Sequence, residues 1–290
     1  MTATVRFLLA GVILGVACED PRASFGAKPG KPHPHTRDSG DTGEADSGGD
    51  SGADSGADSG TDSGGDSGAD SGTDTGPSTL VGIDVSGWDP GIDWDAVAGD
   101  GISFVYIKAT EGTYYTSDEF HSQFTGAAGV GILRGSYHFA NPSYSGAVEQ
   151  ADFFCDNGGT WRNDGKTLPG VLDFEWNPYD GGDCYGMSAK ELGAWVEDFA
   201  SEYEARSGRL PVIYTSKTYW NECVDSDAGK NLPLWVSDWG STPPELPTGW
   251  SDWTFWQTAD DGRVAGVDGD VDMNEFDGHL SELQDFAAGN

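Results

Sequence analysis

Apolar runs of strand length recur through residues 79 to 290, and segments with helical spacing separate them. The runs are hydrophobic at nearly every position, which is typical of strands that are buried on both faces of a parallel sheet. Eight strands are expected, over residues 80–85, 104–109, 132–139, 168–174, 211–215, 234–237, 254–257 and a short piece around 271. Strands that alternate with helices predict an α/β fold in a single domain, most simply a closed TIM-like barrel.

The clearest helix is expected over residues 188–206. Ser188 and Glu191 have the spacing of a capping box at its start, and Gly208 lies just beyond its end. One face of this segment is apolar, and it carries Leu192, Trp195, Val196, Phe199 and Tyr203. A stripe of this kind predicts a helix that packs on the sheet.

The N-terminus has the pattern of an export signal. Arg6 precedes an apolar run over residues 7–17, which is too short to span a bilayer but suits a signal peptide. Small residues precede Cys18, as in the lipobox of bacterial lipoproteins, although Gly15 stands where that motif usually has Leu. We expect residues 1–17 to be a signal peptide, followed either by lipidation of Cys18 or by ordinary cleavage after Ala17. The protein should therefore be exported, either as a cell-envelope lipoprotein or as a secreted protein.

Residues 18–78 are expected to be a disordered acidic linker. Asp recurs every four residues from Asp46 to Asp74, among Ser, Gly, Ala and Thr. Such a segment cannot bury enough apolar surface to offset the entropy that its chain would lose on folding. Calcium-binding loops are a weaker interpretation, because the repeat lacks alternating ligands and a closing Glu.

The charge of the domain is strongly negative, and this excludes some partners. Residues 79–290 contain 36 Asp and Glu against 10 Lys and Arg, within a chain of net charge −34. Such a surface repels nucleic acid, so we expect no nucleic-acid partner, and contact with a membrane only through a lipid on Cys18. All eleven Trp of the chain lie in this domain, which is compatible with a neutral glycan as the substrate.

Two patterns that could bind metal are judged unsuitable. The domain contains three cysteines without a His cluster or a CxxC spacing, so a zinc site is not expected. The alternating acids from Asp268 to Asp272 resemble the start of an EF-hand, but Met273 and His279 stand where Gly and Glu are needed. We expect no metal and no cofactor.

The segment LPGVLDFEWN, residues 168–177, is the strongest candidate for chemistry. Asp173 and Glu175 are two residues apart, so in a strand they would share one face at roughly 6.5–7 Å. That separation suits two carboxylates beside a glycosidic bond, and burial with a like charge nearby would raise the pKa of one of them. Alternatively, both acids are simply solvated at the end of a surface strand.

Other expected strands also end in polar or aromatic residues, and in barrels catalytic groups lie at the carboxyl ends of the strands. These residues are Asp84, Lys108, Tyr137, His138, Tyr214, Trp235, Asp238, Trp256, Gln257 and Asp272. Each has a structural alternative: Lys108 as a buried ion pair, His138 as a core histidine, Trp235 as core packing. Together they predict an acidic, aromatic-lined site that suits sugar rings. Tyr137, Tyr214, Trp235, Trp256 and Gln257 are the expected substrate contacts.

At the level of whole segments, the domain resembles the family 25 glycoside hydrolases, lysozymes that cut peptidoglycan after N-acetylmuramic acid. The resemblance lies in GIDVSGWDP (82–90), FVYIKATEG (104–112), GILRGSYHFANP (131–142), LPGVLDFEW (168–176), PVIYTSKTYW, LPLWVSDW and WTFWQT. It implies a (β/α)5β3 barrel over residues 79–290. The implied activity is cleavage of the β-1,4 bond between N-acetylmuramic acid and N-acetylglucosamine.

The resemblance also implies roles for individual residues. Glu175 matches the catalytic acid, and three supporting acidic positions are matched by Asp173, Asp84 and Asp272. Cys184 and Cys223 match a disulfide found in part of the family, which would leave Cys155 unpaired. The chain departs from the common pattern at Asp89, where Gln is frequent, and at Asp238.

The resemblance favours retention of configuration, with the 2-acetamido group of the substrate as the nucleophile, Glu175 as general acid and base, and Asp173 orienting that amide. We expect a monomer whose partner is the peptidoglycan glycan strand. Two alternatives stay open. A chitinase-like hydrolase would need a further Asp where Val171 stands, and a non-catalytic wall-binding module would keep the same site as a glycan grip.

Overall fold

The computed structural model describes residues 79–240 and 242–290. The expected signal peptide, the Cys18 site and the acidic linker lie outside the described residues. Within the described part of the chain, no helix is both long and apolar enough to cross a bilayer.

Strands and helices alternate along the first two thirds of the domain, as the hydrophobic pattern predicts. The elements are β1 Thr79–Val85, α1 Trp94–Gly99, β2 Phe104–Glu111, β3 Tyr115–Thr116, α2 Phe120–Gly129, β4 Leu133–Phe139, α3 Ala147–Phe154, the π-helical turn η1 Cys155–Gly159, β5 Val171–Asp173, α4 Ala189–Ser207, β6 Val212–Ser216, α5 Lys217–Tyr219, the π-helical turn η2 Trp220–Val224, β7 Leu234–Ser237, β8 Phe255–Gly262, β9 Val271–Asp277 and α6 Leu280–Ala288.

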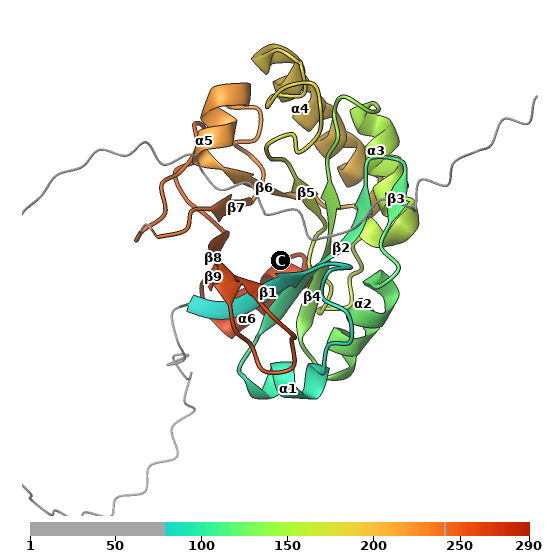
Figure 1. Ribbon diagram of the computed structural model, residues 1–290, viewed down its shortest axis with the longest axis vertical. Coiled ribbons are helices and arrows are strands. Elements are labelled where there is room, and N and C mark those ends of the chain that lie inside the picture. Colours follow the sequence, from blue (N-terminus) through green and yellow to red (C-terminus); the bar gives the residue numbers. More distant parts are fainter. Residues whose placement is uncertain (1–78, 241) are drawn as a thin grey trace, which may run out of the picture. The chain divides into compact units, whose positions relative to one another are not determined.

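Eight of these strands close into a barrel (Figure 1). The strands β1, β2, β4, β5, β6, β7 and β8 pair in parallel, β9 pairs antiparallel with both β8 and β1, and β3 extends β2 as a short antiparallel hairpin. Helices follow each of the first five barrel strands, whereas β7, β8 and β9 are joined without helices. The predicted (β/α)5β3 barrel is confirmed.

Side chains alternate between the inside and the outside of the barrel, because successive residues of a strand point to opposite faces. The half of the interior next to α6, called the lower half below, is filled with aromatic side chains around Phe255. The Phe255 ring lies 5.2 Å from that of Phe104 and 5.3 Å from that of Phe276. Leu283 and Ala287 of α6 pack into the same cluster and cover this end of the barrel. This end is therefore closed by apolar packing.

The longest helix, α4, forms where the capping pattern predicts it. The Ser188 side chain accepts a hydrogen bond from the Glu191 backbone N–H, and the Glu191 carboxylate accepts one from the Ser188 backbone N–H. Gly208 ends the helix at φ +78°, a left-handed conformation that Gly adopts without strain. The predicted apolar face is buried against the outer surface of the sheet.

Several bounds differ from those of the expected elements. β5 spans Val171–Asp173 rather than 168–174, because Pro169 has no N–H to donate to the ladder. The last strand is longer than the expected piece around 271, and the β2–β3 hairpin was not predicted. The short β5 leaves Glu175 just beyond the strand end rather than within it.

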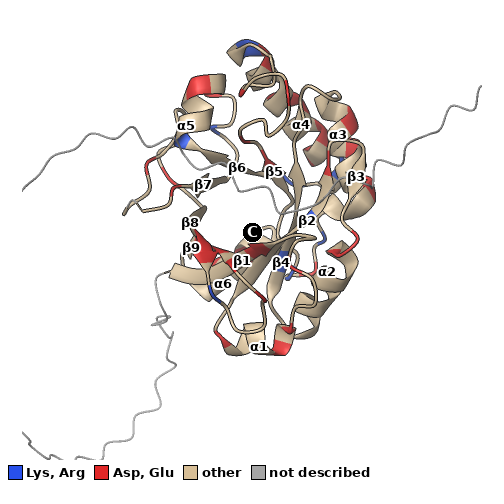
Figure 2. Ribbon diagram, viewed as in Figure 1, with Lys and Arg blue, Asp and Glu red and all other residues tan. Residues whose placement is uncertain are grey.

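Acidic residues are spread over the helices, strands and loops of the domain, with few basic residues between them (Figure 2). The negative charge seen in the sequence therefore belongs to the folded surface as well.

Candidate active site

The upper interior of the barrel is polar, in contrast to the aromatic lower interior. Asp84 in β1, Asp173 in β5, Gln257 in β8 and Asn274 in β9 occupy inward positions near this end. The hydrogen bonds among them, and the register of their strands, fix this layer. Seven of the nine residues expected to form the site lie at this end, whereas Trp235 and Trp256 lie elsewhere. The seven are Asp84, Tyr137, Asp173, Glu175, Tyr214, Gln257 and Asp272.

Asp84 is held by two amides. Its Oδ2 accepts hydrogen bonds of 2.9 Å from Gln257 Nε2 and from Asn274 Nδ2. The orientation of each amide follows from its other partner, because an indole N–H can only donate. Trp235 Nε1 donates to Asn274 Oδ1 at 2.9 Å, and Trp239 Nε1 donates to Gln257 Oε1 at 3.1 Å. Asp84 therefore has a fixed carboxylate that faces two donors.

Asp272 stands directly opposite Asp84 in the antiparallel pairing of β1 with β9. Its side chain is 9% exposed. Two acids therefore meet on one side of the barrel mouth, as the sequence predicted.

Asp173 is the most desolvated of the central acids. It is 7% exposed, and its Oδ1 has no hydrogen-bond partner among the described residues. Burial, followed by the charge of Glu175, raises the pKa of Asp173 well above its usual range. Glu175 is half-buried two residues further along the chain. The two carboxyl groups thus form an electrostatically coupled pair with unequal access to solvent.

Tyr137 and Tyr214 lie among these acids as phenols. Burial raises the pKa of Tyr137 well above its usual range, and the charges of Asp84 and Asp173 add to this effect. Tyr214 donates a hydrogen bond of 2.8 Å to Gln257 Oε1, and burial likewise raises its pKa. Both hydroxyls stay protonated near neutral pH: Tyr214 gives its proton to Gln257, and Tyr137 can donate a hydrogen bond in the site.

A second charged group lies beside the central acids. Lys108 Nζ is 2.7 Å from Glu111 Oε2, and its charge opposes the rise in the pKa of Asp173. A β-bulge between Lys108 and Thr110 changes the alternation of β2, so that two residues three positions apart can meet. The buried ion pair considered for Lys108 is present, and its partner Glu111 was missed. The segment FVYIKATEG contains Glu111, but no local signal revealed the bulge.

The two expected tryptophan contacts have other positions. Trp235 is 2% exposed beneath the acids and stacks on Tyr106 at 5.0 Å. Trp256 packs in the cluster outside the sheet, and its Nε1 donates to Asp238 O at 2.8 Å. Because Gln257 is the next residue and faces inward, Trp256 must face outward. The structure does not bring Trp256 to the acids.

His138 also faces outward, between the sheet and the helices. Its ring nitrogens contact Thr110 Oγ1 at 2.8 Å and Gln150 Oε1 at 3.0 Å, and burial lowers its pKa to about 4. It is the satisfied core histidine that the sequence allowed. Asp89 and Asp238 serve turns: Asp89 Oδ2 accepts from Ser86 N, and Asp238 Oδ2 accepts from Glu245 N.

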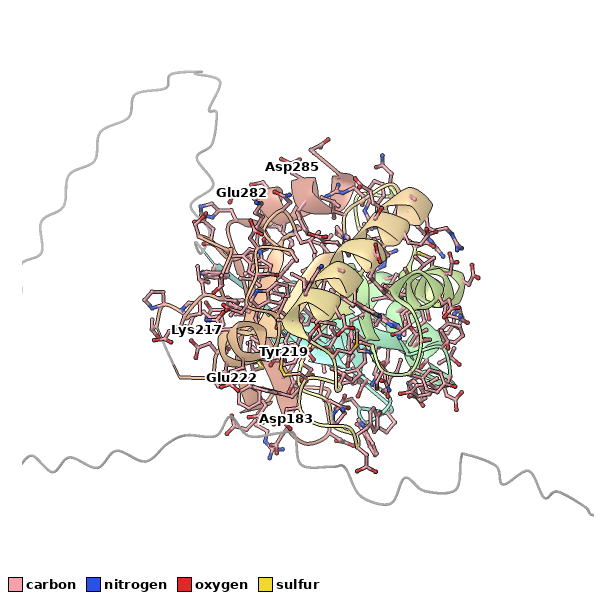
Figure 3. All side chains as sticks on the ribbon, turned by 90° about the horizontal axis from the view of Figure 1, so that it is seen from above. Asp183, Lys217, Tyr219, Glu222, Glu282 and Asp285 are labelled. Carbon is pink, nitrogen blue, oxygen red and sulfur yellow. A yellow bond between two sulfur atoms is a disulfide. The ribbon has the colours of Figure 1, made fainter. Side chains whose placement is uncertain are left out.

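A disulfide fastens the loop that follows Glu175. Cys184 in this loop is bonded to Cys223 in η2, with their Cα atoms 5.3 Å apart, whereas Cys155 is buried and unbonded. Tyr185 OH donates to the carbonyl oxygen of Glu175 at 3.1 Å. Asp183 of this loop lies at the opposite end of the domain from Glu282 and Asp285 of α6 (Figure 3). The loop therefore crosses the polar end of the barrel.

Within the described ranges, no group of three or more His, Cys, Asp or Glu side chains is placed to hold a metal ion. The arrangement instead offers a coupled carboxyl pair, two further acids and two phenol donors. Such a set can donate a proton and stabilise positive charge.

Comparisons with known proteins agree with this chemistry. A family model described as glycosyl hydrolases family 25 matches residues 83–267. Lysozyme M1 of Streptomyces globisporus is 49% identical over 208 residues, 71% of this chain and 70% of that protein. An N,O-diacetylmuramidase of Arthroderma benhamiae is 44% identical over 213 residues, 73% of this chain and 88% of that protein. The crystal structure of a lysozyme from Streptomyces coelicolor is 47% identical, with a TM-score of 0.71 over 74% of this chain and 99% of that one.

Proposed function

The chain belongs to the glycosyl hydrolases of family 25, and we propose that it cleaves peptidoglycan at the β-1,4 bond between N-acetylmuramic acid and N-acetylglucosamine. It is a glycoside hydrolase, and lysozyme and N,O-diacetylmuramidase are its relatives. One observation carries the catalytic part of the proposal: the buried Asp173, with an unpartnered Oδ1 among the described residues, stands beside the half-buried Glu175.

Glu175 is the general acid in this proposal. It lies just past the end of β5, where a glycosidic oxygen can approach it, and it donates the proton that the leaving sugar needs. It later takes a proton from the water that completes hydrolysis. A sugar that covers Glu175 removes water from its carboxylate and thereby favours the protonated form.

Asp173 orients the 2-acetamido group of the substrate. The Asp173 carboxylate, which is 7% exposed, is the acceptor for the amide N–H, and such a hydrogen bond favours its ionised form. In the free protein, burial favours a protonated Asp173. Substrate binding therefore moves the shared proton toward Glu175, where the reaction uses it.

The acetamido oxygen then attacks the anomeric carbon while the bond to the leaving oxygen breaks. The resulting ring carries a positive charge, which Asp173, Asp84 and Asp272 stabilise by their negative field. Water then attacks the anomeric carbon from the face that the leaving sugar vacated, opposite the acetamido oxygen, and the ring opens. The configuration is therefore retained without an ester on the protein. Tyr137 donates a hydrogen bond to the substrate, the Tyr214 oxygen accepts one while its proton goes to Gln257, and Gln257 acts mainly by holding Asp84.

The first 78 residues have a separate role in the proposal. We infer that residues 1–17 direct export, and that residues 18–78 tether the domain to the cell envelope through Cys18 or extend it from the surface. The linker repeat has no large apolar residue with which to dock on the domain, so a chain beginning at Pro77 should match the mature protein on soluble wall fragments.

The test is digestion of purified peptidoglycan by the mature protein, with mass spectrometry of the new reducing ends. N-acetylmuramic acid at those ends supports the proposal. N-acetylglucosamine there would indicate a glucosaminidase. Binding without release would indicate a wall-binding module, and cleavage of chitin in preference to peptidoglycan would indicate a chitinase-like enzyme.

A further inference from the structure

Three exposed tyrosines gather beside the polar end of the barrel. Tyr114 follows β2, Tyr144 follows β4 and Tyr179 lies in the loop after β5, with side chains 44%, 58% and 50% exposed. The rings of Tyr114 and Tyr144 are 4.6 Å apart at 70°. Of the aromatic residues expected from the sequence to contact sugar, Trp235 and Trp256 are buried, and the three tyrosines are more accessible than either.

Glu111 holds this tyrosine cluster in place. Its Oε1 accepts a hydrogen bond of 2.6 Å from Tyr114 OH and another from Tyr179 OH, while its Oε2 pairs with Lys108. Glu111 is 8% exposed, and this burial alone would raise its pKa, but the charge of Lys108 together with these hydrogen bonds keeps the pKa below its usual value. Both rings are therefore fixed by a buried carboxylate rather than left free to turn.

The backbone is also adapted to the cluster. Gly112 has φ +50°, and a Cβ atom placed on it would lie 2.4 Å from the Tyr114 ring. Only a residue without a side chain lets this ring lie over the main chain. Asn141 Nδ2 donates to Tyr114 OH at 3.3 Å, which links the ring to the loop after β4. Fixed rings lose little entropy when a ligand binds.

The cluster is close to the central acids. Tyr179 is four residues from Glu175, so their Cα atoms are at most about 14 Å apart. The charge of Glu111 also contributes to the raised pKa of Asp173. A polymer bound at Glu175 can therefore extend across the tyrosines.

We propose that Tyr114, Tyr144 and Tyr179 bind a sugar of the glycan strand remote from the bond that is cleaved, so that the protein prefers long strands to short ones. This inference rests on the proposed function. Rigid aromatic faces suit the C–H faces of a pyranose ring. The charges nearby disfavour the carboxylates of a stem peptide, since Lys108 is paired and the exposed Asp180 and Asp183 lie in the same loop as Tyr179.

Tyr144→Ala is the most informative variant, because Tyr144 is the most exposed of the three rings. On soluble peptidoglycan glycan strands of increasing length, its KM should rise roughly 3- to 10-fold for long strands. KM for the shortest cleaved strand and kcat for all lengths should stay at wild-type values. Tyr144→Phe, which keeps the ring, should behave like the wild type. The matched control is Leu280→Ala, which removes a side chain of similar exposure (44%) at the start of α6.

A rise in KM of equal size at every length would overturn the proposal, as would an effect seen with stem peptides attached but absent from strands stripped of them. The affinity of the same strands, measured by calorimetry in a Glu175→Gln background with and without Tyr144→Ala, tests the surface independently of cleavage. Equal affinities for long strands would also overturn the proposal. A wild-type protein that cleaves no strand would instead contradict the proposed function.

Discussion

The two halves of the barrel interior are built from the same eight strands but are stabilised in opposite ways. In the lower half, Phe255 contacts five aromatic rings at 5.2–6.4 Å and is fully buried. In the upper half, Asp173 is almost as deeply buried, yet its Oδ1 has no hydrogen-bond partner among the described residues. Burial stabilises the first side chain and is unfavourable for the second.

The lower half of the barrel stabilises the fold, whereas the upper half contains the residues that we propose carry out the chemistry. Apolar packing in the lower half and under α6 offsets the cost of gathering acids at the upper end. Strain of this kind is typical of functional sites, where stability is given up for a group in the required state. Variants in the lower half should therefore change mainly the free energy of unfolding, and variants in the upper half mainly the turnover.

The largest effect on stability is expected in the lower half. Phe255→Ala should lower the free energy of unfolding by about 3–5 kcal/mol, because it removes a buried ring and leaves a cavity between its aromatic neighbours. Urea unfolding followed by tryptophan fluorescence measures this loss. Turnover per folded molecule should stay close to wild type at low temperature, and a specific loss of turnover would show that the two halves are not separable.

The next effect concerns turnover in the upper half. Asp173→Asn should lower kcat by about 10²–10³-fold, since it removes a negative charge from beside the developing positive ring. KM should change little, because the amide still accepts a hydrogen bond. Steady-state kinetics on soluble wall fragments separate the two constants. A variant that loses affinity but keeps kcat would contradict the role assigned to Asp173.

A smaller loss is expected where a residue acts through Asp84. Gln257→Leu removes one of the two donors to Asp84 Oδ2, and the loss of a hydrogen bond to a charged group should lower kcat/KM by about tenfold. Thr258→Val at the next position is the matched control, because Thr258 Oγ1 bonds the main-chain oxygen of Met273. Equal activities of the two variants would argue against the positioning role.

The smallest expected effect is a gain in stability rather than a loss, and it depends on pH. The pKa of Asp173 is raised in the folded protein, so the fold binds this proton more tightly than the unfolded chain does. Below about pH 3.9, the pKa of an Asp in the unfolded chain, Asp173 is protonated in both states and does not destabilise the fold. As pH rises above that value the unfolded chain releases the proton more readily, so Asp173 increasingly destabilises the fold. Asp173→Asn should raise Tm near neutral pH, by about 2–4 °C for each 1 kcal/mol recovered, and should lose this gain in acid. Calorimetry at two pH values measures the difference, and a Tm below wild type at neutral pH would contradict the proposed strain.

The sequence predicts the barrel and most of its polar end, for reasons that are local. Hydrophobic runs identify the strands, and the carboxyl ends of parallel strands must lie on one rim, which brings Asp84, Asp173 and Tyr214 together. Alternation within a strand could also have excluded Trp256, because its neighbour Gln257 faces inward. The pairing of Glu111 with Lys108 depends on a β-bulge, and the length of β9 depends on pairing with β1, so neither is visible in a local pattern.

In the proposed reaction Glu175, at the edge of the polar half, supplies the proton for bond cleavage. The most direct test is kcat of Glu175→Gln on purified peptidoglycan, using protein whose unfolding midpoint and glycan affinity match those of the wild type. We predict that kcat falls by at least ~10²–10⁴-fold, the typical contribution of positioned proton transfer. A near-normal kcat in this folded, substrate-binding variant would contradict the account.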